Sequence, residues 1–214
     1  MPNRSGPTLT RRALITSLLA GATLLSPASG RSATTVTVDA IEAYLNDLGS
    51  MRSRFSQIAP DGSMSTGMFA LERPGRLRLD YDPPSGVLLI APGDWRLVFY
   101  DSTIRQVNVI PIGETPLGFL LDEKVRLSGP VTIVDQRLTG DEVGVTLVRS
   151  DAPDQGNVTL IFAPSPLELR RWVVVDAQGL TTHVILEGIE RGIELDPELF
   201  RWRDPKIFGF PPDD

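Results

Sequence analysis

A series of short apolar segments, separated by turns rich in Pro and Gly, constrains the fold of this chain more than any other feature. The clearest separators are those at 74–75, 83–86 and 92–94. Segments and turns that alternate in this way predict antiparallel strands joined by tight connections. The predicted strands cover residues 67–73, 77–81, 87–91, 95–101, 106–110, 131–136, 143–149, 158–163, 169–176 and 181–187. Roughly ten such strands favour one antiparallel sheet, rolled into a barrel or half-barrel, over a parallel α/β fold.

Helices are expected at three places around these strands. Apolar residues three and four apart over residues 38–58 predict an amphipathic helix, bent or divided at Gly49. A short helix is predicted at 116–121, with Pro116 in its first position. A one-turn helix is predicted at 196–200, after the last strand.

The N-terminus has the pattern of an export signal. Three arginines and no acidic residue precede an apolar run over residues 13–25, and small residues follow it. We therefore interpret residues 1–30 as a signal peptide and residues 31–214 as a single domain. The pair Arg11-Arg12 fits a twin-arginine signal as well as an ordinary secretory one, so both export routes stay open. Either route predicts a protein outside the cytoplasm. Because no cysteine follows the apolar run to carry an acyl anchor, we expect it to be soluble after cleavage.

The composition argues against several classes of function. The 21 Lys and Arg stand against 27 Asp and Glu, and this net charge of −6 gives no electrostatic reason to bind nucleic acid. The chain has no cysteine and one histidine, His183, which excludes thiol chemistry and the usual zinc sites. No phosphate-binding loop or nucleophile-elbow motif occurs, and no spacing singles out a pair of catalytic carboxylates. The sequence therefore singles out no catalytic residue and no cofactor motif, and a metal site built from carboxylates stays open on composition alone.

The alternation of side chains along the predicted strands indicates an apolar interior, which is either ordinary packed core or the wall of a cavity. The candidate wall residues are Phe69, Leu71, Trp95, Leu97 and Phe99. Arg73 falls on the same face of its strand as Phe69 and Leu71, where a guanidinium is costly unless its donors find acceptors. The pattern by itself leaves two interpretations: Arg73 either reaches solvent at the strand end or points inward.

Six motifs follow one another in order along the rest of the chain. They are Phe55-x-Gln57; the stretch at 67–81 (GMFALERPGRLRLDY); the two strands and turn at 89–101; Thr115-Pro116-Leu117 with Leu120-Leu121; the hairpin at 176–179 with Thr182; and the segment at 195–200 with Pro205. Together they resemble the periplasmic outer-membrane lipoprotein carrier (LolA-like) family, and the stretch at 67–81 is the most diagnostic.

The resemblance implies an incomplete, half-open antiparallel β-barrel of roughly ten to eleven strands, covered by a lid of short α-helices. It implies that acyl chains of a lipoprotein cargo occupy the interior. The carrier would take this cargo from an ATP-driven lipoprotein-releasing complex of the inner membrane to an outer-membrane lipoprotein acceptor. It also implies that Arg73 points inward and hydrogen-bonds the lid, as a latch on the empty carrier. The expected lid residues are Leu45, Leu48, Phe55, Pro116, Leu117, Leu120 and Leu121.

Three other functions stay open at this point. They are a periplasmic binder or sensor of other lipids on the same fold, a cell-envelope hydrolase that uses carboxylates, and a structural subunit that docks through a sheet edge. Removal of residues 1–30 would take away three arginines and change the net charge from −6 to −9. Anionic membrane surfaces repel such a protein, which suits a carrier that loads through a specific partner.

Overall fold

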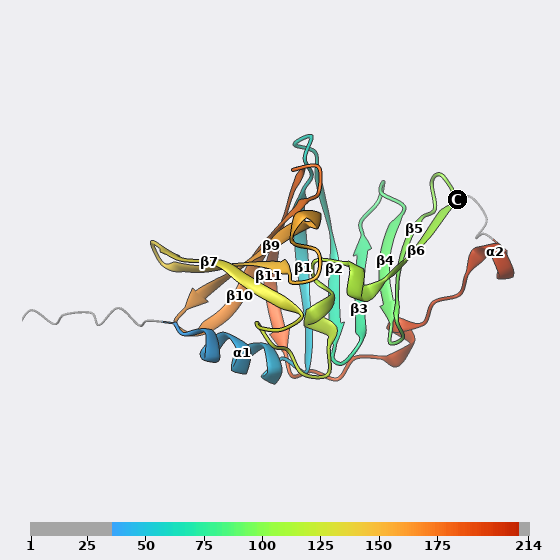
Figure 1. Ribbon diagram of the computed structural model, residues 1–214. Coiled ribbons are helices and arrows are strands. Elements are labelled where there is room, and N and C mark those ends of the chain that lie inside the picture. Colours follow the sequence, from blue (N-terminus) through green and yellow to red (C-terminus); the bar gives the residue numbers. More distant parts are fainter. Residues whose placement is uncertain (1–35, 210–214) are drawn as a thin grey trace, which may run out of the picture. The chain divides into compact units, whose positions relative to one another are not determined.

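The structure, a computed structural model, describes residues 36–209, and the expected signal peptide at 1–30 lies outside this range. Eleven antiparallel strands make up most of it (Figure 1). They are β1 (Ser50–Ile58), β2 (Met64–Glu72), β3 (Arg76–Tyr81), β4 (Val87–Pro92), β5 (Arg96–Asp101), β6 (Gln106–Pro111), β7 (Val131–Thr139), β8 (Glu142–Arg149), β9 (Gly156–Pro164), β10 (Leu167–Asp176) and β11 (Thr181–Arg191). The helices are α1 (Val38–Asp47), α2 (Pro205–Phe208) and the 3₁₀ turns η1 (Ile112–Glu114), η2 (Gly118–Leu121), η3 (Pro153–Gln155) and η4 (Pro197–Phe200).

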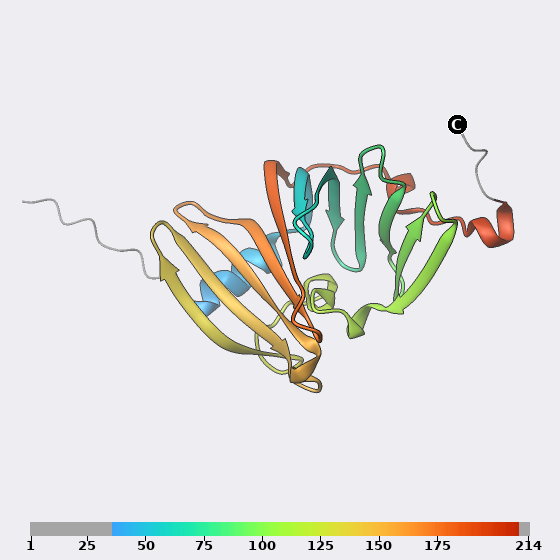
Figure 2. The ribbon, with the colours of Figure 1, turned by 90° about the horizontal axis from the view of Figure 1, so that it is seen from above.

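The strands form a single open sheet in the order β6-β5-β4-β3-β2-β1-β11-β10-β9-β8-β7. Two meanders of consecutive strands therefore meet where β1 pairs with β11. The edge strands β6 and β7 follow each other in the chain but lie at opposite edges, so residues 112–130 have to cross the open side of the curved sheet (Figure 2). This arrangement confirms the predicted half-open antiparallel barrel with short helices.

The predicted helix over residues 38–58 is wrong in its second half. The helix ends at Asp47, and residues 50–58 form β1, the strand that joins the two meanders. Met51, Ser53 and Phe55 are buried while the residues between them are exposed, which is the alternation of a strand. Pairing with β2 on one side and β11 on the other satisfies the backbone of this segment, and it accounts for the eleventh strand.

The predicted helix at 116–121 is also wrong in detail. The chain forms the two 3₁₀ turns η1 and η2 instead, closed by hydrogen bonds between residues three apart, such as Gly118 N to Thr115 O at 3.1 Å. A Cβ on Gly118 would lie 2.1 Å from the carbonyl oxygen of Ile112, so the tight fold of this segment depends on glycine there. The one-turn helix predicted at 196–200 is present as η4, with the Asp196 side chain accepting from Glu198 N at 2.9 Å.

Apolar side chains pack on both faces of the sheet. The main core fills the concave face and includes the buried residues of α1. On the outer face, the segment from Leu195 to Trp202 lies against Ala70 and Tyr100 of β2 and β5. Within residues 36–209, no helix is long and apolar enough to cross a membrane.

Candidate functional site

The concave side of the half-barrel is covered by two segments that are hydrogen-bonded to each other. Asn46 of α1 donates to Val125 O and accepts from Val125 N, both at 2.9 Å. Glu42 of α1 accepts from Leu127 N at 2.6 Å. We call residues 38–48, which are α1 and its C-cap Leu48, together with residues 112–127 the lid. Because three hydrogen bonds join its two parts, the lid is expected to move as a unit.

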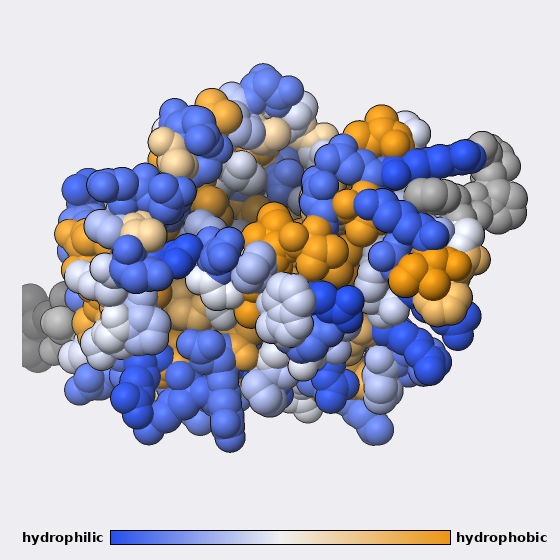
Figure 3. Space-filling view, turned by 45° about the vertical axis from the view of Figure 1, so that its right-hand side comes forward, coloured by the Kyte–Doolittle hydropathy of each residue, from blue (hydrophilic) through white to orange (hydrophobic). Residues whose placement is uncertain are grey.

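A cavity of about 260 Å³ lies between the lid and the concave face of the sheet. Its lining is mostly apolar, and six of the 24 lining residues carry a polar side-chain group. These six are Gln57, Arg73, Tyr81, Thr115, Trp172 and Thr182. Figure 3 shows that apolar side chains also gather in the middle of one face of the molecule, surrounded by hydrophilic ones. A mostly apolar cavity with a few placed polar groups is the usual form of a small-molecule binding site.

Most of the residues singled out in the sequence meet at this cavity. The sheet contributes Phe69, Leu71 and Leu97, and the lid contributes Leu45, Leu48, Pro116, Leu117, Leu120 and Leu121. They come from segments up to 76 residues apart, and the alternation within each strand identifies the common face of those that lie on the sheet.

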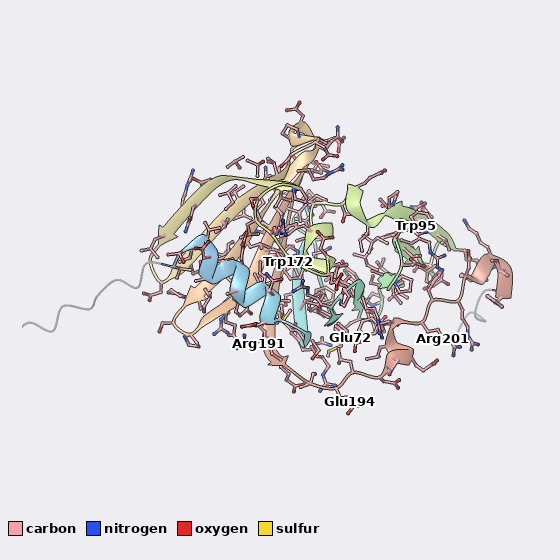
Figure 4. All side chains as sticks on the ribbon, turned by 60° about the horizontal axis from the view of Figure 1, so that its bottom comes forward. Glu72, Trp95, Trp172, Arg191, Glu194 and Arg201 are labelled. Atoms are coloured by element: carbon pink, nitrogen blue, oxygen red, sulfur yellow. The ribbon has the colours of Figure 1, made fainter. Side chains whose placement is uncertain are left out.

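Three of the candidates lie elsewhere. Trp95 is in the turn before β5 and is 64% exposed, because the two-residue alternation does not extend into a turn. In Figure 4, Trp95 lies far from Trp172, which lines the cavity. Phe99 is half-buried opposite Leu89 but does not line the cavity. Phe55 belongs to β1 and not to the lid.

Sequence reasoning missed several lining residues. Leu77, Leu79 and Tyr81 alternate on β3, and their register with Phe69 and Leu71 places them on the concave face. Extending the two-residue alternation from one predicted strand to the next would have found them. Met51 also lines the cavity, and it was missed because its segment was predicted to be helical rather than a strand. Trp172 carries no comparable signal, since its inward position depends on the bulge between Leu169 and Arg171 on β10.

Arg73, just after β2, points into the lid. Its Nη1 donates to Leu45 O, one of the last carbonyls of α1, which have no partner within the helix. Its Nη2 donates to Asp122 O at 2.6 Å and to Glu123 O at 3.4 Å. The guanidinium thus links both parts of the lid to the sheet. Its Nε is buried without a hydrogen-bond partner among the described residues, so the closed arrangement satisfies it incompletely.

Burial shifts the pKa values of Arg73 and of the nearby Asp122 carboxyl. Burial lowers the pKa of Arg73, with the Asp122 carboxylate opposing the shift, and arginine stays charged throughout the physiological range. Burial likewise raises the pKa of Asp122, and Arg73 opposes that shift. The side chain that holds the lid is therefore a partly desolvated cation bonded mainly to neutral carbonyls.

A second polar contact lies further along β1. Tyr81 Oη donates to Gln57 Oε1 at 2.7 Å, and burial raises the pKa of Tyr81. The ring of Phe55 meets the Tyr81 ring edge-on, with centroids 5.0 Å apart, across Gly67 of β2. A Cβ on Gly67 would lie 2.2 Å from Asp80 O and 2.6 Å from the Phe55 ring, so glycine lets the two rings meet.

The fold and the cavity define a half-barrel protein with a lid over an apolar interior. The chain belongs to the family described as outer membrane lipoprotein carrier protein LolA, whose profile matches residues 46–203. The outer-membrane lipoprotein carrier protein of Alkalilimnicola ehrlichii is 31% identical over 180 residues, covering 76% of this chain and 78% of that protein. The carrier of the same name from Methylococcus capsulatus is 27% identical over 176 residues, covering 77% and 82%.

Solved structures resemble this chain more weakly. A LolA superfamily protein from Nitrosomonas europaea superposes with a TM-score of 0.44 at 12% sequence identity, covering 78% of this chain and 98% of that one. The family assignment therefore rests on the sequence matches.

Proposed function

We propose that this protein is a periplasmic carrier that shields the acyl chains of lipoproteins in its cavity and moves them from the inner to the outer membrane. The observation that carries the proposal is the lidded cavity with an almost wholly apolar lining. Each methylene moved out of water stabilises the bound state by about 0.8 kcal/mol, so an acyl chain needs such a shield in transit. Membership of the LolA family supports the same function.

The lid has to move before cargo binds. The cavity of about 260 Å³ is smaller than the roughly 300–1,000 Å³ typical of ligand pockets, and cargo with more than one acyl chain needs more room. Opening breaks the hydrogen bonds from Arg73 to Leu45 and Asp122. We infer that Arg73 is a latch that stabilises the closed, empty state. Cargo binding is weakened by the free energy of these contacts, which keeps delivery possible.

The polar groups of the cavity suit binding better than catalysis. The six lining residues with a polar group include no carboxylate and no histidine, so neither threonine hydroxyl has a base within the lining. We propose that the protein is not an enzyme and acts as a monomer. Its partners would be an ATP-driven lipoprotein-releasing complex in the inner membrane and a lipoprotein acceptor in the outer membrane.

Native mass spectrometry of the protein purified from the periplasm tests this function. We expect a fraction of the carrier to hold an acylated lipoprotein, and spheroplasts to release lipoprotein into solution when the purified carrier is added. The control is the same preparation with a water-soluble form of the cargo that lacks acyl chains, which should not bind. Purification with a free lipid, and no release from spheroplasts, would instead indicate a lipid-binding or sensor protein.

A further inference from the structure

Hydrogen bonding divides the polar groups of the cavity into occupied and free ones. Arg73 is bonded to the lid, Thr115 donates to Ile112 O at 2.8 Å, and Tyr81 donates to Gln57. The Gln57 amide NH₂, the Thr182 hydroxyl and the Trp172 indole NH have no hydrogen-bond partner among residues 36–209. These three side chains therefore keep hydrogen-bond donors available inside an otherwise apolar lining.

Two of these donors, Gln57 and Thr182, lie on the same face of neighbouring strands, and Trp172 of β10 is opposite Val184 of β11. Gln57 of β1 is opposite Val184 of β11, so Thr182, two residues before Val184, is its diagonal neighbour on the same face. Diagonal neighbours are about 7–8 Å apart, close enough for one ligand head to contact both. The hydrogen bond from Tyr81 fixes Gln57 Oε1, which turns the amide NH₂ away from the tyrosine.

This donor pair is at the opposite end of the cavity from Arg73. Ser50 of β1 is opposite Glu72, next to Arg73, and Gln57 lies seven residues further along β1. At about 3.3 Å per residue, roughly 20 Å separate the two positions. In Figure 1, α1 lies at the bottom and the turn between β1 and β2, which follows Gln57, lies at the top. The lining between the two ends is mostly apolar.

We propose, building on the carrier function above, that Gln57 and Thr182 bind the carbonyl groups that join the acyl chains to the head of the cargo. Acyl chains are attached through ester or amide groups, whose carbonyl oxygens lose water when the chains enter the cavity. An acceptor that loses water without gaining a donor is destabilising, and these two side chains offer donors at one end of the lining that no group of the described residues uses. The cargo head then lies near the β1–β2 turn and the chain ends point toward Arg73.

Binding of two matched lipopeptides tests the proposal. One carries two ester-linked palmitoyl chains on its N-terminal cysteine, and the other has the same chains ether-linked and so lacks the carbonyl acceptors. We expect the wild type to bind the ester form about five- to tenfold more tightly, as one or two hydrogen bonds predict. Gln57→Leu and Thr182→Val should each lower this preference, and the double variant should lower it further than either single change. Gln106→Leu, at an exposed position of β6, is the control and should keep it.

The outcomes separate this inference from the carrier function. Equal wild-type affinity for the ester and ether forms would overturn the role of Gln57 and Thr182 and leave the carrier function intact. Failure to bind either form would contradict the carrier function itself. As a second measurement, a nitroxide at the end of an acyl chain should broaden NMR signals around Arg73 and not those around Gln57. The reverse pattern would overturn the proposed orientation. Unchanged unfolding midpoints show that the variants still fold.

Discussion

Replacing Arg73 by leucine tests the latch most directly. The substitution removes the guanidinium that donates to Leu45 O of α1 and to Asp122 O of the 112–127 segment. Leucine keeps an apolar side chain against the cavity, so we expect the strands and the lid to form normally. The change therefore acts on the balance between the closed and open lid.

The expected change in cargo affinity follows from the two hydrogen bonds that Arg73 donates to Leu45 O and Asp122 O. A hydrogen bond to a charged group contributes about 1.5–3 kcal/mol, so two of them contribute at least about 3 kcal/mol in favour of closure. Arg73 is only half-buried and keeps part of its hydration, and we therefore take half of this sum, about 1.5 kcal/mol. Cargo binding no longer has to break these contacts in the variant, so its affinity for cargo should rise about tenfold.

The assay measures lipopeptide affinity and the rate of transfer from the loaded carrier to outer-membrane vesicles. We expect Arg73→Leu to bind cargo more tightly and to transfer it more slowly, with an unfolding midpoint only about 3–6 °C lower than that of the wild type. Arg78→Leu is the matched control, because Arg78 also donates to a backbone carbonyl, that of Leu199 at 3.1 Å, but outside the cavity. Equal affinity and equal transfer rate for Arg73→Leu and the wild type would refute the latch.

Three further predictions concern stability and the lid. Gly67→Ala should lower the free energy of unfolding by about 2 kcal/mol, which corresponds to about 4–8 °C in the Tm measured by thermal unfolding. Gly144→Ala is the control and should leave the Tm unchanged, because a Cβ there would lie 3.7 Å from its nearest neighbour, a methyl carbon of Thr159. Equal midpoints for the two variants would contradict the close packing at Gly67. The hydrogen bond from Arg54 lowers the pKa of Asp82 below its ordinary value of 3.8. The stability that this pair contributes is therefore present above pH 3.8 and is lost as the pH falls through the lowered pKa of the native state. Acid titration should show a weaker pH dependence for Asp82→Asn, and an unchanged dependence would exclude this pair as a contributor. Asn46→Ala should speed amide exchange in residues 122–127, and unchanged exchange would mean that Asn46 does not hold the lid together.

The sequence predicted the strands well where turn residues mark both of their ends. All ten predicted strands are present, with bounds that differ by a few residues. β1 was missed because its apolar residues also fit the three- and four-residue spacing of a helix continuing from residues 38–47. Pairing with β2 and β11 decides the conformation of this segment, and those partners are distant in the sequence.

The cavity was predictable to the extent that it follows from alternation within a strand. Phe69 and Leu71 line it as expected, while the same reasoning failed for Trp95, which lies in a turn. The alternation left open whether Arg73 reaches solvent or points inward. Its acceptors decide for the inward position, and they could not be predicted from local pattern because Leu45 and Asp122 lie 28 and 49 residues away.

The sequence alone determined the mainly β class, the positions of most strands and the family, because turn residues, side-chain alternation and motif order are local properties of the chain. The tertiary structure decided that β1 joins two meanders and that residues 112–127 bond to α1 as a lid. It also decided which polar groups remain free in the cavity. These features depend on contacts between segments far apart in the chain, and such contacts form only when the whole sheet has assembled.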